Sequence, residues 1–353
     1  MQIVRPVQTD DLEALMQLAK KTGGGMTSMP ADYDLLAKRI ADSVTACETE
    51  LTGDDGATYF MVLEDTATGD LVGTTAIYTN VGLDLPFYTY KVLRVMQRCP
   101  ELDHIQETQL LTLTNDFTGS TEIGSLFLLP EFRFGGNGAL LSRARYMLMG
   151  NRPERFGEKT IAEMRGFRDE DDKSPVWEHL GIKFFGIAFD DADIMSGVSD
   201  KRFISDLMPK YPIYIDLLPK VAQEAIGVPF PASLPALKML QKEGFRYTNY
   251  VDIFDGGPTV EVYTADIHTI QQTRTLRVSG FVELPETKNK MLISTGYLRR
   301  FKCCLADVHI EGNEVQISPT LADILNVKIG DELKVAPGRV VDNGRFTTST
   351  KAF

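Results

Sequence analysis

Short apolar runs and helical stripes alternate along the start of the chain. Gln2–Arg5 predicts a short strand. The capping residues 9–11 precede apolar positions 12, 15, 16 and 19, which have the spacing of one helix face. Three glycines at 23–25 end this helix, and a second helix is predicted from about Tyr33 to Ser43.

A hairpin follows the two predicted helices. Tyr59–Glu64 and Leu71–Tyr78 read as strands, and the polar segment between them, which contains Gly69, predicts the turn. The chain therefore opens with the order strand, helix, helix, strand, strand.

The next clear pattern is a strand, a glycine-rich loop and a helix. Ile123–Leu129 is apolar, Pro130–Gly138 reads PEFRFGGNG, and apolar residues follow at 140, 141, 144, 147 and 148. These positions predict a helix with a one-sided apolar stripe, with Ser142, Arg143 and Arg145 mostly off it.

A helix that ends at a glycine and leads into an aromatic strand is predicted twice. It is expected at Ser174–Gly181 with the strand Phe184–Phe189, and again within Ala236–Tyr247. The repetition suggests a second half related to the first, although a glycine C-cap at any helix-to-strand junction gives the same match. Asp255–Pro258, DGGP, predicts a boundary before a small β-rich tail. Short alternating segments of this tail are 260–263, 276–282, 291–294, 314–317 and 333–335.

Composition narrows the function. The 353 residues carry a net charge of −12 without a basic run, so nucleic-acid binding through phosphates is not expected. No apolar run approaches the roughly 20 residues of a membrane helix, and the first residues do not follow the pattern of a signal peptide. The four cysteines lack the spacing of a metal site and read as reduced thiols. These features predict a cytoplasmic enzyme for small molecules, without a metal.

The pattern Arg133-x-x-Gly136-x-Gly138 lies between the apolar strand and the helix. A helix N-terminus offers unpaired backbone N–H donors and a partial positive charge. Gly135, Gly136 and Gly138 would let a phosphate approach the backbone around Asn137, and Arg133 would add a charged contact. The pattern is similar to the pyrophosphate signature of GNAT-type N-acyltransferases, although a glycine-rich turn is the simpler interpretation. Neither a Walker loop nor a GxGxxG fingerprint is present.

Several longer segments resemble the arginine N-succinyltransferase family. They are IVRPVQTDDLEALMQLAKKTGGGMTSMP, FMVLEDTATGDLVG, YTYKV, NDFTGSTEIGSLFLLPEFRFGGNGALLSRARYMLM, AEMRG, SPVWEHLG, FISDLMPKYPIY and LQKEGFRYTNYVDIFDGGPT. The resemblance is dense from Met1 to about Thr259 and loose in the tail. It implies transfer of succinyl from succinyl-CoA to the α-amine of L-arginine, with succinyl-CoA as co-substrate and no permanently bound cofactor.

The resemblance also implies an α+β fold of the GNAT-like acyl-CoA N-acyltransferase type. Together with the repetition, it predicts an acyl-CoA-binding domain at 1–190 and a second GNAT-like half at 191–258 that completes the active site. A small β-rich domain is expected at 259–353. An oligomer is expected as well, either homomeric or built with a related subunit.

Two site positions follow from the resemblance. The family's succinyl-CoA contact falls on Leu126, in the strand EIGSLFL, where a core residue is equally compatible. The family's proton donor is a histidine, and Phe230 stands in its place; Phe117 replaces another family histidine. Phenylalanine cannot exchange a proton. Three readings follow: an active arginine or ornithine succinyltransferase, a transferase for another amine, or a non-catalytic CoA-binding subunit.

Acylation of an amine by a thioester needs a neutral amine, a stabilised carbonyl oxygen and a leaving thiolate. Glu122 is the candidate base, acting through water, and an edge-strand or cap carboxylate is its other interpretation. The backbone N–H near Leu126 is the candidate oxyanion donor. Tyr211 and Tyr214 are candidates for protonating the sulfur, with core tyrosines as the alternative.

An arginine substrate favours a carboxylate that binds its guanidinium in bidentate fashion. Asp116, Asp252 and Asp255 lie in segments that resemble the family and are the candidates for this contact. Asp255 has a second interpretation as a residue that shapes the DGGP turn.

Overall fold

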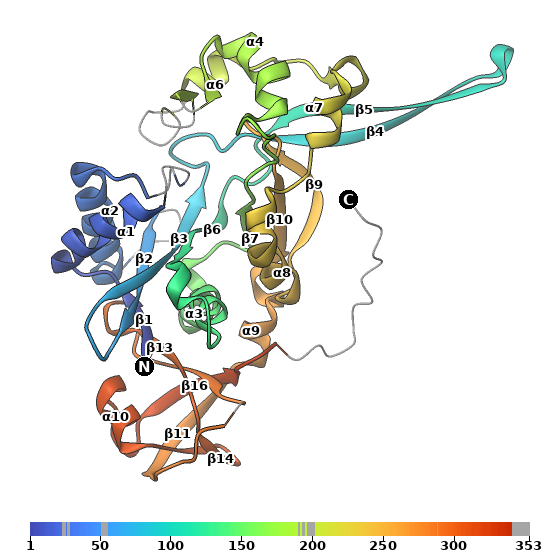
Figure 1. Ribbon diagram of the computed structural model, residues 1–353. Helices are drawn as coiled ribbons and strands as arrows, with labels where there is room; N and C mark the ends of the chain where they lie inside the picture. Colours follow the sequence, from blue (N-terminus) through green and yellow to red (C-terminus); the bar gives the residue numbers. More distant parts are fainter. Residues whose placement is uncertain are drawn as a thin grey trace.

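The computed structural model describes residues 1–22, 26, 29–50, 56–189, 191–192, 195, 202–287 and 289–340. The strands of these residues form one mixed sheet (Figure 1). Their order across it is β14-β15-β11-β16-β12-β13-β1-β2-β3-β6-β7-β10-β9-β4-β5-β8. The observed mixture of helices and strands agrees with the predicted α+β class.

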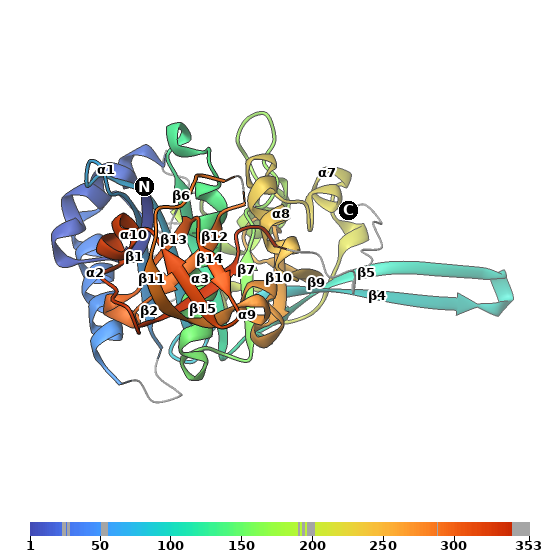
Figure 2. The same ribbon diagram turned by 90° about the horizontal axis from the view of Figure 1, so that it is seen from below.

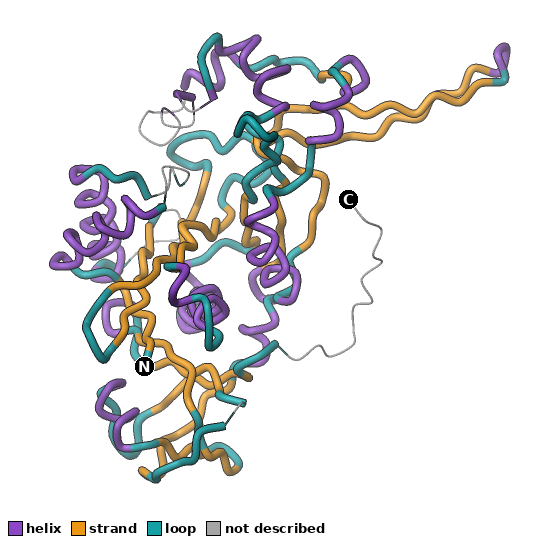
Figure 3. The backbone as a smooth tube through the Cα atoms, viewed as in Figure 1, coloured by secondary structure: helices purple, strands orange, loops and turns teal. Residues whose placement is uncertain are grey.

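The bounds of the strands are β1 (Gln2–Pro6), β2 (Thr58–Asp65), β3 (Leu71–Val81), β4 (Thr89–Cys99), β5 (His104–Thr114), β6 (Ser120–Leu128), β7 (Lys159–Glu163), β8 (Ile213–Tyr214), β9 (Arg246–Asp252), β10 (Pro258–Tyr263), β11 (Arg274–Phe281), β12 (Met291–Thr295), β13 (Lys302–Ala306), β14 (His309–Glu311), β15 (Glu314–Ile317) and β16 (Glu332–Pro337). The helices are α1 (Leu12–Lys21), α2 (Tyr33–Glu48), α3 (Asn137–Asn151), α4 (Ile182–Phe185), α6 (Arg202–Leu207), α7 (Lys220–Ala225), α8 (Leu234–Lys242), α9 (His268–Gln272) and α10 (Pro319–Leu325). Figure 3 shows these helices in purple and the strands in orange. Of the helices described, none combines the length and the apolar character needed to cross a membrane.

The predicted opening order of strand, helix, helix, strand, strand is confirmed. Asp32 caps α2 by accepting a hydrogen bond from the N–H of Leu35 at 2.9 Å. The Ser43 hydroxyl accepts a hydrogen bond from the N–H of Phe60 on β2 at 2.9 Å, which fixes α2 against the sheet. α1 and α2 lie on one side of β2 and β3, and α3 lies on the other (Figures 1 and 2).

Helix α3 is buried on nearly every side, so the predicted one-sided stripe is wrong. Ser142, Arg143 and Arg145 are all buried, because α3 contacts β3 and β6 as well as β13 and α9. Arg143 forms an ion pair with Glu243, with 3.0 Å between Nε and Oε1. Arg145 donates to the carbonyl and hydroxyl of Ser142, and burial lowers its pKa.

The helix around Trp177 also differs from its prediction. Gly181 has helical backbone angles, and the chain continues through a π-helical turn into α4, which ends at Gly186 with a φ of 67°. The predicted strand Phe184–Phe189 is therefore wrong. Its residues join the core instead, because the Phe185 ring stacks on Trp177 with 5.2 Å between centroids.

The second occurrence of the pattern forms as predicted. α8 is followed by Gly244, with a φ of 102°, and then by β9. Because the two occurrences differ in structure, the observation that suggested a duplicated second half is lost. The boundary expected at 190/191 falls within one hydrophobic cluster, which contains Leu180 and Phe185 as well as Ile204 and Met208.

The predicted tail strands at 276–282, 291–294, 314–317 and 333–335 are present as β11, β12, β15 and β16. Segment 260–263 belongs to β10 instead, which lies between β7 and β9. The predicted domain of 259–353 thus includes one strand that lies between β7 and β9. We call the residues from Arg274 onward, after α9, the C-terminal unit. Its strands continue the main sheet, because β13 pairs with β1 through Cys304 and Ile3.

The hairpin of β4 and β5 projects from the body as a long ribbon (Figures 1 and 2). The two strands pair along their full length, from Thr89 with Thr114 to Cys99 with His104. Within the described residues, β4 pairs with β9 at 89–91 and β5 pairs with β8 at 110–111. Residues 92–109 extend beyond these contacts, and we call them the arm.

Candidate active site

β6 and β7 begin as parallel neighbours and then separate. Among the described residues, their pairing is confined to Thr121 with Thr160 and Glu122 with Ile161. Beyond these pairs β7 stays with β10, and β6 stays with β3. The sheet therefore opens beside the second half of β6, where an extended ligand can lie along the strand.

The same half of β6 contains a β-bulge. The register between β3 and β6 shifts so that Ser125 and Leu126 together face Thr75. Ser125 has a φ of 50°, in the left-handed region. A bulge removes one residue from the regular ladder and re-aims its backbone, so Leu126 lies at an irregular point of the strand. Leu126 is half-buried and packs against the main core, as its core interpretation expects, and its contact with succinyl-CoA stays a prediction.

The loop after β6 turns the chain into the first turn of α3. Gly135 and Gly136 have φ values of 62° and 90°, in the left-handed region that favours glycine. No side chain caps the start of α3 in the described structure. The first N–H groups of the helix, among them those of Gly138 and Ala139, have no acceptor within it. The loop therefore presents backbone donors at the end of β6.

Two polar side chains shape this loop. Arg133 donates from Nε to the Leu128 carbonyl at 3.0 Å and remains exposed. Asn137 is buried and donates from Nδ2 to the Phe132 carbonyl at 3.1 Å. The Arg133 side chain can still reach a ligand, whereas the Asn137 side chain holds the loop together.

Glu122 lies where β6 and β7 separate. Two residues near it, Tyr78 and Arg39, were not predicted from the sequence. A Cβ added at Gly124 would lie 4.0 Å from Oε1 of Glu122 and 3.3 Å from the Tyr78 ring, so both side chains cover this face of β6. Arg39 of α2 hydrogen-bonds to the Tyr78 side chain. Burial raises the pKa of Tyr78, Arg39 and the Ser125 hydroxyl oppose the rise, and the Glu122 charge adds to it.

Phe230 lies on the β7 side of the opening. Its N–H donates to the Arg165 carbonyl at 2.7 Å, just beyond the end of β7. Gly166 and Pro229 form a β-bridge next to this contact. The position expected for a proton donor is therefore close to the parted strands, but it carries a half-buried ring. Phe117, the other replacement, is buried against Tyr250 with 4.6 Å between ring centroids.

Asp252 and Asp255 hold the DGGP turn. Asp255 is buried, and its two oxygens accept the N–H groups of Gly166 at 2.7 Å and Gly257 at 2.8 Å. Burial raises the pKa of Asp255, and these hydrogen bonds oppose the rise. Oδ1 of Asp252 accepts the N–H groups of Phe254 and Asp255 at 2.7 and 2.9 Å. The turn interpretation of Asp255 is confirmed, and its burial leaves no room for a bidentate guanidinium.

Asp116 is the most exposed of the three candidate aspartates. Its Oδ2 accepts a hydrogen bond from the Tyr250 hydroxyl at 2.6 Å and lies 3.7 Å from Nζ of Lys91. The carboxylate is thus oriented by a tyrosine and partly neutralised by a lysine, with 47% of the side chain open to solvent.

Tyr211 and Tyr214 lie far from the bulge. Tyr214 belongs to β8, six positions from β6 in the strand order, which is roughly 25–30 Å at the usual strand spacing. Tyr211 precedes β8 and is 84% exposed. Neither can protonate a sulfur beside Leu126, so this prediction is wrong.

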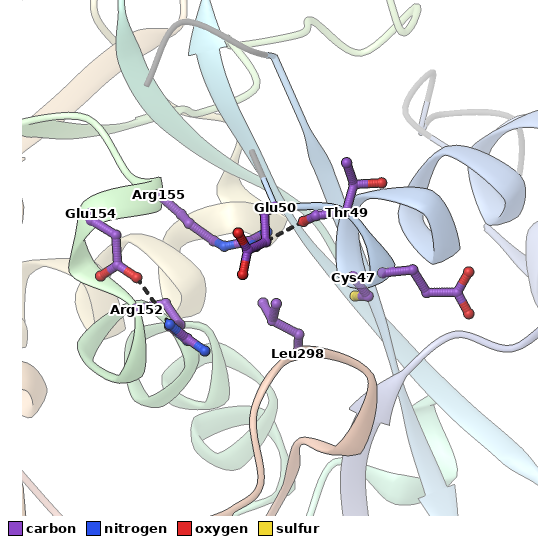
Figure 4. Close-up of a pocket in the computed structure, with 8 residues that line it drawn as sticks. Cys47, Thr49, Glu50, Arg152, Glu154, Arg155 and Leu298 are labelled. Atoms are coloured by element: carbon purple, nitrogen blue, oxygen red, sulfur yellow. Dashed lines mark hydrogen bonds and ion pairs between the residues drawn. The ribbon is translucent and has the colours of Figure 1, made fainter. Parts of the chain in front are cut away.

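A separate cavity of about 370 Å³ lies at the end of α2 (Figure 4). Arg155 donates there to the carbonyls of Ala46 and Thr49, which satisfies the C-terminal end of the helix. The lining residues are Cys47, Glu48, Thr49, Glu50, Arg152, Glu154, Arg155 and Leu298. None of the predicted site residues lines this cavity.

Comparison with known proteins shows the family of this chain. Residues 2–269 match the family described as arginine N-succinyltransferase beta subunit, and residues 274–337 match the C-terminal domain of that subunit. Arginine N-succinyltransferases from Enterobacter sp. (strain 638) and Salmonella schwarzengrund (strain CVM19633) are each 41% identical to this chain, covering 95% of it and 97% of their own length. A solved structure, arginine/ornithine succinyltransferase subunit AI from Pseudomonas aeruginosa, superposes with a TM-score of 0.86 at 32% identity, covering 96% of this chain and 99% of that one.

Proposed function

Because this chain belongs to the arginine N-succinyltransferase family, we propose that it transfers the succinyl group of succinyl-CoA to the α-amine of L-arginine. One observation carries the proposal. The parted strand β6, with its bulge at Ser125 and Leu126, runs directly into the loop and first turn of α3. A long thioester with a pyrophosphate at one end and a reactive carbonyl at the other fits such a path.

The pyrophosphate is expected at the start of α3. There the backbone N–H groups at the start of the helix, those of Gly138 and Ala139, and the helix dipole favour an anion, and the exposed Arg133 adds a positive charge. The pantetheine chain of CoA contains amide groups. These would hydrogen-bond to the backbone along the second half of β6, as a neighbouring strand would. This arrangement brings the thioester close to Leu126, as the GNAT-like interpretation requires.

The chemical step needs little from the side chains. An α-amine has a pKa near 8, so Glu122 acting through water would suffice to remove its proton. The backbone N–H near Leu126 would stabilise the carbonyl oxygen as the amine adds. The nitrogen loses one proton to Glu122 before it attacks and a second when it becomes an amide. When the C–S bond breaks, the thiolate takes one of these two protons, and the other is released to solvent. Phe230 cannot pass a proton to the sulfur, so water in the opening relays it in this scheme.

For the acceptor substrate, Asp116 is our candidate partner of the guanidinium. It is exposed, and the Tyr250 hydroxyl orients its carboxylate. Asp252 and Asp255 contribute through the turn that they form. The relative from Pseudomonas aeruginosa is described as an arginine/ornithine succinyltransferase, so ornithine is the second acceptor to test.

A second candidate function is a CoA-binding partner of a catalytic subunit. Phe230 favours it, because the expected proton donor is absent at that position. The description of the Pseudomonas aeruginosa relative as subunit AI also favours assembly with a related chain. A homo-oligomer is the alternative assembly. The four free thiols fit a reducing compartment, and we place the protein in the cytoplasm.

Mass spectrometry of the reaction tests the proposal. The purified chain is incubated with succinyl-CoA or acetyl-CoA and with arginine, ornithine or lysine in turn. We expect N-succinylarginine and free CoA in equal amounts, with less product from acetyl-CoA. Tight binding of succinyl-CoA without product from any amine would favour the partner subunit, and a preference for ornithine would revise the acceptor.

A further inference from the structure

Ser125 adopts a backbone conformation that its side chain disfavours. Its φ of 50° lies in the left-handed region, where a Cβ crowds the following carbonyl oxygen and where glycine is the usual residue. Ser125 is also 5% exposed, so solvent does not stabilise this geometry. Surrounding contacts must therefore hold the bulge in place.

Two contacts from β3 hold Ser125. The Tyr78 hydroxyl and Oγ of Ser125 lie 2.6 Å apart. Oγ1 of Thr74 donates to the Ser125 carbonyl oxygen at 2.9 Å. The side chain and the carbonyl of the strained residue are thus both tied to the strand that the bulge faces.

Tyr78 has a second polar neighbour. Arg39 of α2 hydrogen-bonds to the Tyr78 side chain, and a guanidinium carries donors only, so the Tyr78 oxygen accepts from Arg39. In the contact between Tyr78 and Ser125 either hydroxyl can be the donor. Gly124 leaves room for the Tyr78 ring, since a Cβ there would lie 3.3 Å from it.

We propose that Tyr78 is a positioning residue, which holds Ser125 in the left-handed conformation and thereby aims the backbone at Leu126 toward the thioester. The inference rests on the proposed function, because it assigns a purpose to the bulge in that reaction. Tyr78 need not touch either substrate. It acts by keeping the bulge in one geometry while the acyl group is transferred.

A double-mutant cycle tests the proposal. Tyr78→Phe removes the hydroxyl, Ser125→Ala removes its hydrogen-bond partner and keeps the Cβ, and Ser125→Gly removes the partner together with the backbone strain. We expect Tyr78→Phe and Ser125→Ala each to lower kcat about tenfold, the equivalent of one hydrogen bond. KM for succinyl-CoA should stay within about twofold. Ser125→Gly should lose less than Ser125→Ala, because glycine adopts the conformation unaided.

The decisive measurement is Tyr78→Phe in the Ser125→Gly background. If the hydroxyl serves only to hold Ser125, the second substitution should change kcat by less than about twofold. An equal tenfold loss in both backgrounds, or no loss from Tyr78→Phe alone, would overturn the proposal. Tyr33→Phe, at an exposed tyrosine of α2, is the matched control, and thermal melting verifies that each variant folds.

A failure of the proposed function gives a different result. In that case the unsubstituted chain makes no acylated product with any amine. The positioning proposal then falls together with the proposed function. An active chain in which Tyr78→Phe leaves kcat unchanged overturns the positioning proposal alone.

Discussion

At the scale of single residues, Glu122 shows how a break between strands positions a carboxylate. It is the last residue of β6 that pairs with β7, and its half-buried side chain shares a strand face with Gly124. If β6 and β7 stayed paired beyond Glu122, the sheet would have no opening at this point. Because the strands separate, the Glu122 carboxylate lies at the edge of the opening that we assign to the thioester.

Glu122→Gln should lower kcat about 100-fold at pH 7, the usual contribution of a general base. The deficit should narrow as pH rises from 7 to 9, because an α-amine with a pKa near 8 becomes neutral without help. The pH profile of kcat for both proteins checks this result. Glu314→Gln, at an exposed position of strand β15, is the control, and a deficit that stays constant with pH would argue against a base.

At the scale of elements, two glycines at the start of α3 serve different purposes, one for the fold and one for ligand binding. Gly136 has a φ of 90°, and a Cβ there would lie 3.2 Å from Leu305 of the C-terminal unit. Gly138 lies within the helix, and its added Cβ would meet Leu128 at an ordinary 4.0 Å. The fold therefore requires glycine at 136, whereas at 138 it does not.

This contrast gives a paired prediction. Gly138→Ala should keep or slightly raise the melting temperature, since alanine favours a helix interior, and should raise KM for succinyl-CoA at least about tenfold by covering backbone donors. Gly136→Ala should lower the melting temperature by several degrees, because an L-residue is strained there. Unchanged KM in Gly138→Ala would place the pyrophosphate elsewhere.

The buried ion pair of α3 makes the second prediction at this scale. Glu243 forms an ion pair with Arg143 and accepts hydrogen bonds from the N–H and hydroxyl of Thr269, so it joins α3 to α9. Glu243→Gln should lower the free energy of unfolding by about 3–5 kcal/mol, because Arg143 would keep an uncompensated buried charge. Urea unfolding measures the loss. The exposed pair of Lys38 and Asp42 is the control, and Asp42→Asn should cost under about 0.5 kcal/mol.

At the scale of the whole molecule, the sequence pattern correctly predicted the helices and strands that bury one face. It failed for elements that are buried on nearly every side or that have no buried face. The opening strands and α2 followed their periodicity. α3 did not, because the C-terminal unit covers the side that should have been polar. The Gly124–Ser125 pair inside an apolar strand was a signal for the bulge, but the contact with Tyr78 depends on strand register that the sequence does not reveal. No strands were predicted at β4 and β5. A ribbon without a buried face does not need alternating apolar and polar residues, so its sequence lacks the pattern that predicts a strand.

The arm should be separable from the body. Two-stranded ribbons are marginally stable alone in water, and the arm exposes Met96, Leu102 and Ile105 at 62, 75 and 58%. Replacing residues 96–107 with Asn-Gly joins the paired Val95 and Thr108 by a tight turn. We expect the melting temperature to change by less than about 2 °C, since few body contacts are lost. Calorimetry measures it, and a loss of many degrees would show that the arm supports the body.

The position of β1 in the sheet bears on how the chain reaches its native state. Ile3 pairs with Glu64 on one edge and with Cys304 on the other. At about 5–20 residues per second, a ribosome needs roughly 15–60 s to make the second partner after the first strand emerges. Through that interval the nascent amino-terminal strand has one edge open to wrong pairing, so refolding from denaturant should be slow for the size of the chain. A holdase chaperone that shields β1 during translation should raise the yield of active protein.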